Sequence, residues 1–137
     1  MKLAMWTALA AALMLAALPV EGKLGKTDKI KVKVTARPAS CPVRSKVGNS
    51  VSINYTGMLA SNGVKFDANV DRNAPFTFKI GAGRVIKGLE QGTTGMCVGE
   101  KGRLTVPPSL AYGATGMAGF IPPQFTLVYD VELLAIK

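Results

Sequence analysis

The residues most able to form a binding or catalytic site are aromatic side chains scattered through the chain, with one aspartate beside them. They come from five separate segments: Tyr55, Phe66, Phe76, Phe78, Tyr112 and Tyr129, with Asp67 next to Phe66. An apolar hollow lined by aromatic rings, with a few polar groups that orient the ligand, is the usual form of a small-ligand or peptide site. The alternative is that the rings only fill the core. We expect this alternative for Phe78, whereas Tyr112 lies in a Gly/Pro-rich loop, which favours a functional role.

Several common catalytic chemistries lack their residues in this chain. None of the 137 residues is a histidine, which excludes Ser-His-Asp and Cys-His nucleophiles and histidine-based zinc sites. The 2 cysteines cannot form a four-thiolate metal site and do not form a C-x-x-C redox pair. Gly81-Ala82-Gly83 begins a dinucleotide-binding pattern, but Ile86 stands where the third glycine is needed. We therefore expect no metal and no cofactor.

The elements that must position the aromatic residues are predicted by alternating sequence. Apolar and polar residues alternate over 30–36, 51–55, 76–80 and 125–133, which predicts strands with one buried face. Ser61-Asn62-Gly63 predicts a turn, and a short strand over 103–106 is stopped by Pro107-Pro108. Residues 85–96 contain the one helix candidate, which is short and interrupted by glycines. Antiparallel strands around one short helix indicate an α+β domain.

The first 22 residues have the pattern of a secretory signal peptide. Lys2 precedes an uncharged run rich in Ala and Leu from Leu3 to Val20, and small residues stand at the −3 and −1 positions of a cut after Gly22. A membrane anchor is the alternative, since the run is just long enough to span a bilayer. We expect cleavage, with no membrane span left in the remaining chain.

The formal net charge of +9 is concentrated near the start of the mature chain. Residues 23–46 hold eight lysines and arginines against Asp28 alone, a net charge of +7. A patch for nucleic acid or anionic lipid is one interpretation. The other interpretation is that alternating lysines protect an edge strand from aggregation. We favour this second interpretation because no aromatic residues lie between these lysines. We expect a basic arm over 23–35 and no nucleic-acid partner.

Cys41 and Cys97 can form only one intrachain disulfide. An exported chain with an even number of cysteines favours the bridge. Two separate buried thiols are the alternative.

Short blocks of residues occur along most of the mature chain, over about residues 36–137: Tyr55-Thr56-Gly57-Met58-Leu59, Lys65-Phe66-Asp67, Asp71-Arg72-Asn73, Val85-Ile86-Lys87-Gly88, Ala111-Tyr112-Gly113 and Ile121-Pro122-Pro123. In their order and spacing these blocks resemble the FKBP-type peptidyl-prolyl isomerases. Cys41-Pro42 and Gly95-Met96-Cys97 resemble the secretory-pathway members, in which these two cysteines are bridged.

The resemblance implies a five- or six-stranded antiparallel sheet wrapped around the short helix, with a pocket between them. It assigns Asp67 and Tyr112 to catalysis, Asp67 being held at the rim by Arg72 and Tyr55. It assigns substrate binding to Tyr55, Phe66, Arg72, Phe76, Val85, Ile86, Leu89, Phe120, Ile121 and Tyr129. Leu89 departs from the family, which usually has tryptophan at the pocket floor, so drug binding is more in question than isomerase activity.

The implied function is isomerisation of X-Pro bonds by a monomer in the endoplasmic reticulum lumen or in secreted form, with a bacterial periplasm as the alternative location. The implied partners are proline-containing polypeptides and macrolide immunosuppressants. One rival is a binding module that keeps the pocket but has little turnover. Another is a protein that binds anionic surfaces through residues 23–46.

Overall fold

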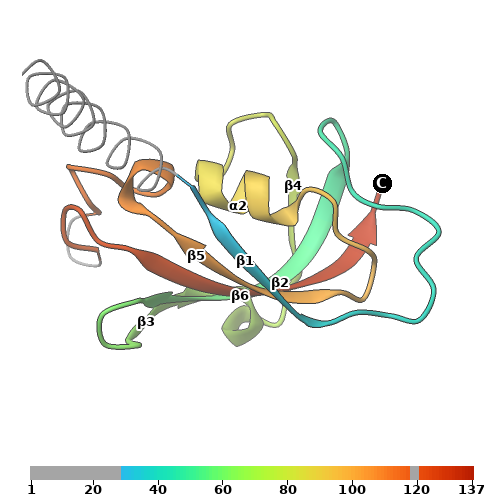
Figure 1. The fold of residues 1–137 in the computed structure, drawn as a ribbon, viewed down its shortest axis with the longest axis horizontal. Coiled ribbons are helices and arrows are strands. Elements are labelled where there is room, and N and C mark those ends of the chain that lie inside the picture. The colour runs from blue at the N-terminus through green and yellow to red at the C-terminus, as the bar shows by residue number, and fades with distance from the viewer. Residues whose placement is uncertain (1–28, 118–120) are drawn as a thin grey trace, which may run out of the picture.

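The computed structural model describes residues 29–117 and 121–137 (Figure 1). In chain order its elements are β1 (Lys31–Ala36), β2 (Ser50–Leu59), β3 (Lys65–Ala68), the 3-10 helix η1 (Asn69–Arg72), β4 (Phe76–Lys79), α2 (Lys87–Thr93), β5 (Lys101–Val106), the 3-10 helix η2 (Pro108–Leu110) and β6 (Leu127–Ile136). The predicted α+β class is confirmed. The predicted signal peptide, the first residues of the basic arm and Phe120 lie outside the described residues. Over the described ranges, no helix is long and apolar enough to cross a membrane.

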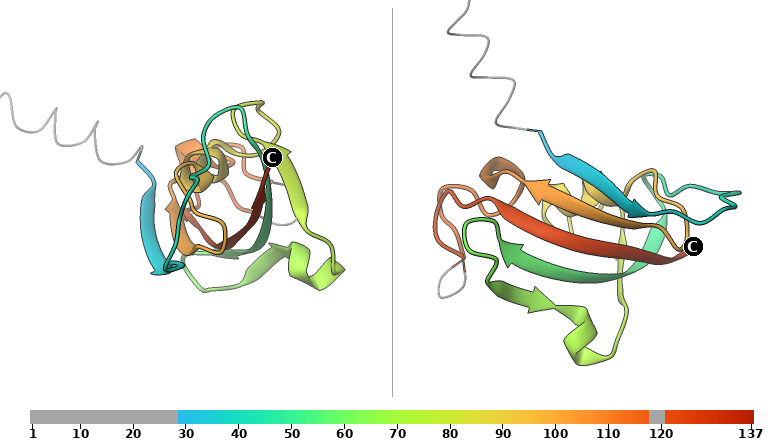
Figure 2. Two further views of the ribbon diagram at one scale, coloured as in Figure 1. Left: turned by 90° about the vertical axis from the view of Figure 1, so that its right-hand side faces the viewer. Right: turned by 60° about the horizontal axis from the view of Figure 1, so that its bottom comes forward.

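All six strands pair in one antiparallel sheet with the order β1-β5-β6-β2. The remaining edge of β2 pairs with two strands in succession, β4 along its first half and β3 along its second half. Figure 2 shows β6 between β5 and β2, and the sheet curving around α2. The resemblance implied five or six strands, and the structure has six.

The core lies between α2 and the inner face of the sheet. In β2 every second residue is buried, beginning with Val51 and Ile53, and β6 alternates in the same way. Ile53, Leu104 and Leu133 are each 0% exposed, and burying such a side chain contributes roughly 1.5–3 kcal/mol. The alternation predicted from the sequence thus forms the core of the domain.

Two glycines allow α2 to approach the sheet closely. A Cβ atom on Gly88 would come within 2.3 Å of Val106, and one on Gly92 within 2.4 Å of Leu104. The two glycines are four residues apart, so they lie on the same face of the helix. Contact with β5 therefore requires glycine at both positions, which explains why the helix sequence is interrupted by them.

Asn69 completes the hydrogen bonding of β2 where β3 ends and β4 has not yet begun. Its Oδ1 accepts the Tyr55 N–H at 2.6 Å, and its Nδ2 donates to the carbonyls of Ile53 (3.0 Å) and Ala74 (2.9 Å) and to Asn54 Oδ1 (3.1 Å). Asn69 is 1% exposed. The side chain thus takes the place of a neighbouring strand's backbone, and the inserted residues of η1 do not leave buried polar groups of β2 unpaired.

β1 is a strand, as predicted, but the expectation of one buried face is wrong. All six of its residues are exposed, and Val32 and Val34 retain 52% and 40% of their surface. β1 is the outermost strand, and α2 packs against β5 rather than against β1. Lys31 and Lys33 alternate along this edge, as in strands protected against edge-to-edge association.

A disulfide joins Cys41 to Cys97, which confirms the predicted bridge and rules out two separate thiols. Cys97 is 0% exposed and follows α2, whereas Cys41 lies in the loop after β1. The same loop pairs with this region through Ser45, whose N–H donates to the Met96 carbonyl at 2.9 Å. The bridge therefore ties the N-terminal loop to the end of the helix.

Replacing Asn69 should destabilise the domain far more than replacing an exposed asparagine. Asn69→Ala removes the partners of several buried backbone groups, and we expect the free energy of unfolding to fall by about 2–4 kcal/mol. Asn62→Ala is the matched control, because its Oδ1 accepts one exposed N–H, from Val64. Urea unfolding measures both. Loss of similar size in the two variants would contradict the role given to Asn69.

Removing the disulfide should also destabilise the chain. The cysteines are 56 residues apart, and closing such a loop contributes about 4 kcal/mol in the chain-entropy description. We expect the Cys41→Ala/Cys97→Ala double variant to lose stability of this order in urea unfolding, and the native protein to weigh two hydrogens less than its reduced form. Alkylation of both thiols in the native protein would show that the bridge does not form.

Candidate active site

A hollow lies between α2 and the inner face of the sheet, with a volume of about 190 Å³. We call it the aromatic pocket, and its lining residues are Tyr55, Asp67, Phe76, Arg84, Val85, Ile86, Leu89, Tyr112 and Tyr129. They come from β2, β3, β4, α2, β6 and two loops. Residues up to 74 positions apart in the sequence (Tyr55 and Tyr129) thus share one surface.

Edge-on and tilted contacts between aromatic rings form the wall of the pocket. Tyr55 lies 5.6 Å from Phe76 and 6.1 Å from Tyr129, measured between ring centroids. Phe66 packs edge-on against Tyr129 at 5.8 Å. Such pairs favour a fixed ring orientation beyond the effect of burial. Gly57 leaves space for this packing, since a Cβ there would lie 2.7 Å from Phe66.

The floor of the pocket is formed by Leu89, which is 5% exposed, in the first turns of α2. Val85 and Ile86 precede the helix in a loop that begins at Gly81. Glu90 holds this loop in place, because its Oε2 accepts the N–H groups of Gly81 (2.8 Å) and Gly83 (3.1 Å). No hydrogen bond within the described residues uses the Ile86 N–H, which leaves this donor available at the pocket.

Asp67 is held at the rim by two partners. The Tyr55 hydroxyl donates to its Oδ2 at 2.6 Å, and Arg72 Nη1 donates to its Oδ1 at 2.9 Å. Arg72 Nη2 also donates to the Tyr55 hydroxyl at 3.2 Å. Burial acts to raise the pKa of Asp67, but the hydrogen bonds from Tyr55 and Arg72 and the charge of Arg72 outweigh it and lower this pKa. The carboxylate is therefore ionised at neutral pH.

The tyrosines of the pocket keep their protons at neutral pH. Burial is the main cause that raises the pKa of Tyr55, Tyr112 and Tyr129 above its ordinary value, and the nearby charge of Asp67 acts in the same direction. The pocket thus offers phenol donors, one ionised carboxylate, the Arg84 guanidinium and apolar ring surface. It contains no group that changes its charge near neutral pH. This arrangement can bind, orient and desolvate a ligand, whereas proton transfer would require a group that titrates.

A loop after β5 covers one side of the pocket. Tyr112 lies in this loop, shortly after η2, and its carbonyl accepts the Gly116 N–H at 3.0 Å. Met117 and Ile121 close the loop with two backbone hydrogen bonds of 2.7 and 2.8 Å. Ile121 is 4% exposed and packs in the core cluster beside the pocket.

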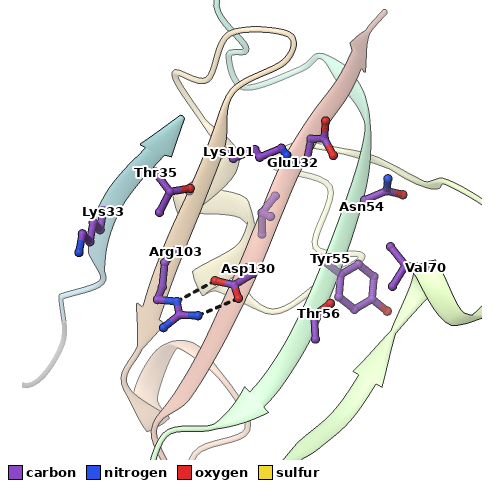
Figure 3. Close-up of a pocket in the computed structure, with 12 residues that line it drawn as sticks. Lys33, Thr35, Asn54, Tyr55, Thr56, Val70, Lys101, Arg103, Asp130 and Glu132 are labelled. Carbon is purple, nitrogen blue, oxygen red and sulfur yellow. Dashed lines mark hydrogen bonds and ion pairs between the residues drawn. The ribbon is translucent and has the colours of Figure 1, made fainter. Parts of the chain in front are cut away.

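A larger hollow of about 470 Å³ lies on the opposite, outer face of the sheet (Figure 3). It is lined mainly by charged and polar side chains, and Arg103 and Asp130 form two hydrogen bonds of 2.7 and 2.9 Å there. Apart from Tyr55 it has no aromatic residue. The aromatic pocket is the stronger candidate despite its smaller volume, because ring surface and a few convergent polar groups are what a specific ligand site requires.

The structure brings together most residues that the sequence singled out. Eight of them line the aromatic pocket: Tyr55, Asp67, Phe76, Val85, Ile86, Leu89, Tyr112 and Tyr129. Phe66 packs against Tyr129, Arg72 binds Asp67, and Ile121 lies in the adjoining core. Phe78 is 5% exposed and belongs to the core, as predicted.

Sequence reasoning missed Arg84 and Asn69. The only signal for Arg84 was its position next to Val85, and nothing in a polar turn sequence distinguished Asn69 from Asn73. No cluster of three potential metal ligands occurs within residues 29–117 and 121–137.

Comparison with known proteins gives one consistent result. The profile of the family described as FKBP-type peptidyl-prolyl cis-trans isomerase matches residues 41–134. FK506-binding protein 2 of Dictyostelium discoideum is 52% identical over 111 residues, which cover 81% of this chain and 83% of that protein. Peptidyl-prolyl cis-trans isomerase FPR2 of Saccharomyces cerevisiae is 50% identical over 97 residues, 71% of this chain and 72% of that protein. Peptidyl-prolyl cis-trans isomerase FKBP2 of Mus musculus is 43% identical over 122 residues, 89% of this chain and 84% of that protein.

Proposed function

The chain belongs to the FKBP-type peptidyl-prolyl cis-trans isomerase family, and we propose that its aromatic pocket isomerises X-Pro bonds of polypeptides that fold in the secretory pathway. The observation that carries the proposal is the set of aromatic rings that surrounds a hollow with hydrogen-bond donors and no group that titrates near neutral pH. A proline ring is apolar and the amide before it is polar, and the pocket offers surface for both.

The reaction requires rotation about an amide bond rather than proton transfer. The barrier is roughly 20 kcal/mol, because twisting the bond breaks amide resonance. The twisted amide is less polar than the planar one, so a pocket that excludes water favours it relative to the planar form. Phe66, Tyr55 and Ile121 would hold the proline ring, and contacts that strengthen as the bond twists would lower the barrier.

The polar groups of the pocket would orient the bound peptide. The Tyr112 hydroxyl and the Ile86 N–H are donors for carbonyls on either side of the X-Pro bond. Asp67, ionised and held by Arg72 and Tyr55, would act by its charge and by fixing Tyr55. We propose Phe120 as a further substrate-binding residue, on the resemblance to the family alone.

Entry into the secretory pathway is supported by two observations. Residues 1–22 have the pattern of a signal peptide, and the structure has a disulfide, which persists in oxidising compartments. We propose that residues 1–22 are removed, that 23–35 form a basic arm and that 36–137 form the isomerase domain. In this division β1, which begins at Lys31, joins the end of the arm to the sheet.

We also propose that the pocket binds macrolides of the FK506 type, with Leu89 limiting the affinity. Leucine offers less surface than the tryptophan that the family usually has at the floor. A large macrolide ring resting on this floor would therefore lose contact area. A small proline ring depends less on contact with the floor.

A prolyl-isomerisation assay on a short X-Pro peptide tests the function. We expect activity in the purified protein, and Phe66→Ala should lower kcat/KM at least about tenfold, equivalent to about 1.4 kcal/mol of transition-state stabilisation. Lys65→Ala is the control, because this exposed neighbour of Phe66 is not among the residues that line the pocket. Between about pH 6 and 8 the rate should be nearly constant, since the Asp67 pKa is lowered and the tyrosine pKa values are raised, away from this range.

Three results would count against this proposal. Full activity in a folded Phe66→Ala variant, or a steep change of rate near neutral pH, would contradict the mechanism. Absence of activity in the unaltered protein would favour the rival function, a binding module with little turnover.

Leu89→Trp should separate drug binding from turnover. A larger aromatic floor should raise the affinity for FK506 by about tenfold, because more apolar surface is buried in the complex, while kcat/KM on a short peptide changes by less than about threefold. Leu89→Met is the control, since it keeps the floor volume nearly unchanged. Titration with the drug and the isomerase assay on the same samples measure both quantities. Equal changes in affinity and turnover would refute the role proposed for Leu89.

A further inference from the structure

Arg84 is a charged residue of the aromatic pocket to which the mechanism above gives no role. Its side chain is exposed and lines the mouth of the pocket beside Val85 and Ile86. Every other ionisable group of the lining is either a protonated tyrosine or Asp67. Arg84 is therefore the one cation among the nine residues that line the pocket.

Asp67 in the pocket and Glu90 beside the loop both have hydrogen-bond partners other than Arg84. Glu90 Oε2 accepts the N–H groups of Gly81 and Gly83, which fixes the loop that carries Arg84. Asp67 is neutralised by Arg72 at 2.9 Å. The ion pairs within residues 29–117 and 121–137 involve Arg37, Lys65, Arg72 and Arg103, and none of them includes Arg84.

The mouth of the pocket consequently carries a net positive charge. Arg72 and Asp67 cancel each other, and the charges of Arg84 and of exposed Lys87, close by in the sequence, exceed the single negative charge of Glu90 by one. A bound peptide with a carboxylate near its proline would meet an unpaired guanidinium, a group whose planar set of donors suits carboxylates. A peptide with a lysine at that place would meet a like charge.

We propose that Arg84 is a specificity-determining residue, which makes the enzyme prefer X-Pro bonds that have an acidic residue among the two positions on either side of the proline. The proposal rests on the isomerase function proposed above and names its substrate class. The range covers two residues of extended chain on each side of the proline, about 7 Å. Arg84 is exposed whereas Leu89 at the floor is buried, so we place the selected residue beside the proline and not at it.

The expected effect is modest, because the pair would be exposed to solvent. An exposed ion pair changes an equilibrium by up to about fivefold, so a glutamate peptide should exceed its glutamine counterpart by roughly threefold in kcat/KM. Including repulsion of lysine, the ratio of glutamate to lysine peptides should reach roughly tenfold at low salt. It should shrink at high salt, where the screening length falls to a few ångströms.

The test uses the purified protein and short peptides of one sequence, in which one of the four positions flanking the proline is Glu, Gln or Lys. For each peptide, kcat/KM is measured at low and at high salt, and binding is followed in parallel by NMR titration. The ratio of Glu to Lys peptides should fall towards one in Arg84→Gln and invert in Arg84→Glu. Lys33→Glu is the matched control for Arg84→Glu, because it makes the same change in net charge but on the outer face of the sheet (Figure 3). It should leave both the Glu-to-Lys ratio and the activity unchanged.

The outcomes separate this proposal from the one on which it rests. Turnover of the Gln peptide reports the isomerase function alone, and if it is absent, the ratio of binding affinities still tests Arg84. A ratio near one in the unaltered protein at all four positions overturns the proposal. So does a ratio that persists in Arg84→Gln, which would assign the preference to Arg72 or Lys87, or an equal loss in Lys33→Glu, which would assign it to net charge.

Discussion

Asn69 holds together the part of the sheet on which the pocket depends. β2 must present Tyr55 to the pocket while its outer edge passes from one partner strand to another, and at that passage the backbone of residues 53–55 would lack hydrogen-bond partners. The Asn69 side chain supplies them from a position that is almost fully buried. Because of this, the chain between β3 and β4 can leave the sheet, form η1 and return with Arg72 placed against Asp67 and Tyr55. The positions of Tyr55 in the pocket wall and of Asp67 and Arg72 at the rim therefore depend on the side-chain amide of Asn69.

The pKa shifts of Asp67 and of the pocket tyrosines keep the charge of these groups constant near neutral pH, so they do not favour proton transfer. The same burial that would make an isolated carboxylate costly is offset at Asp67 by a cation and a phenol, and it keeps the tyrosines protonated. A site of this kind stabilises a less polar, twisted amide by excluding water and by fixed dipoles, which suits a reaction with no acid or base. In the proposals made above, charge at the mouth, where Arg84 lies, sets the selectivity between substrates, and shape at the floor, where Leu89 lies, sets the affinity for macrolides.

Strand alternation predicted the core because it reflects a single physical requirement, the burial of one face of a sheet. Residues such as Ile53 and Leu133 lie inside for this reason, and the blocks around Tyr55, Phe66 and Tyr112 were sufficient to indicate the family and its pocket. The same reasoning gave the wrong environment for β1. Alternation shows that a strand has an apolar face, but it does not show whether another element covers that face, and α2 does not extend over β1.

The sequence alone determined the α+β class and the aromatic composition of the site. It also determined the pairing of two cysteines in an exported chain and excluded catalysis by histidine. These properties depend on residue types, on local spacing and on a resemblance carried by short blocks. The tertiary structure decided the order of the strands, the burial of Asn69 as a substitute for backbone pairing, and the charge balance at the pocket mouth. These depend on distances between residues: Arg72 pairs with Asp67, whereas Arg84, the one cation among the lining residues, takes part in none of the ion pairs within residues 29–117 and 121–137. Local sequence does not contain that information, because each carboxylate could have paired with any of several cations until the fold brought one of them within reach.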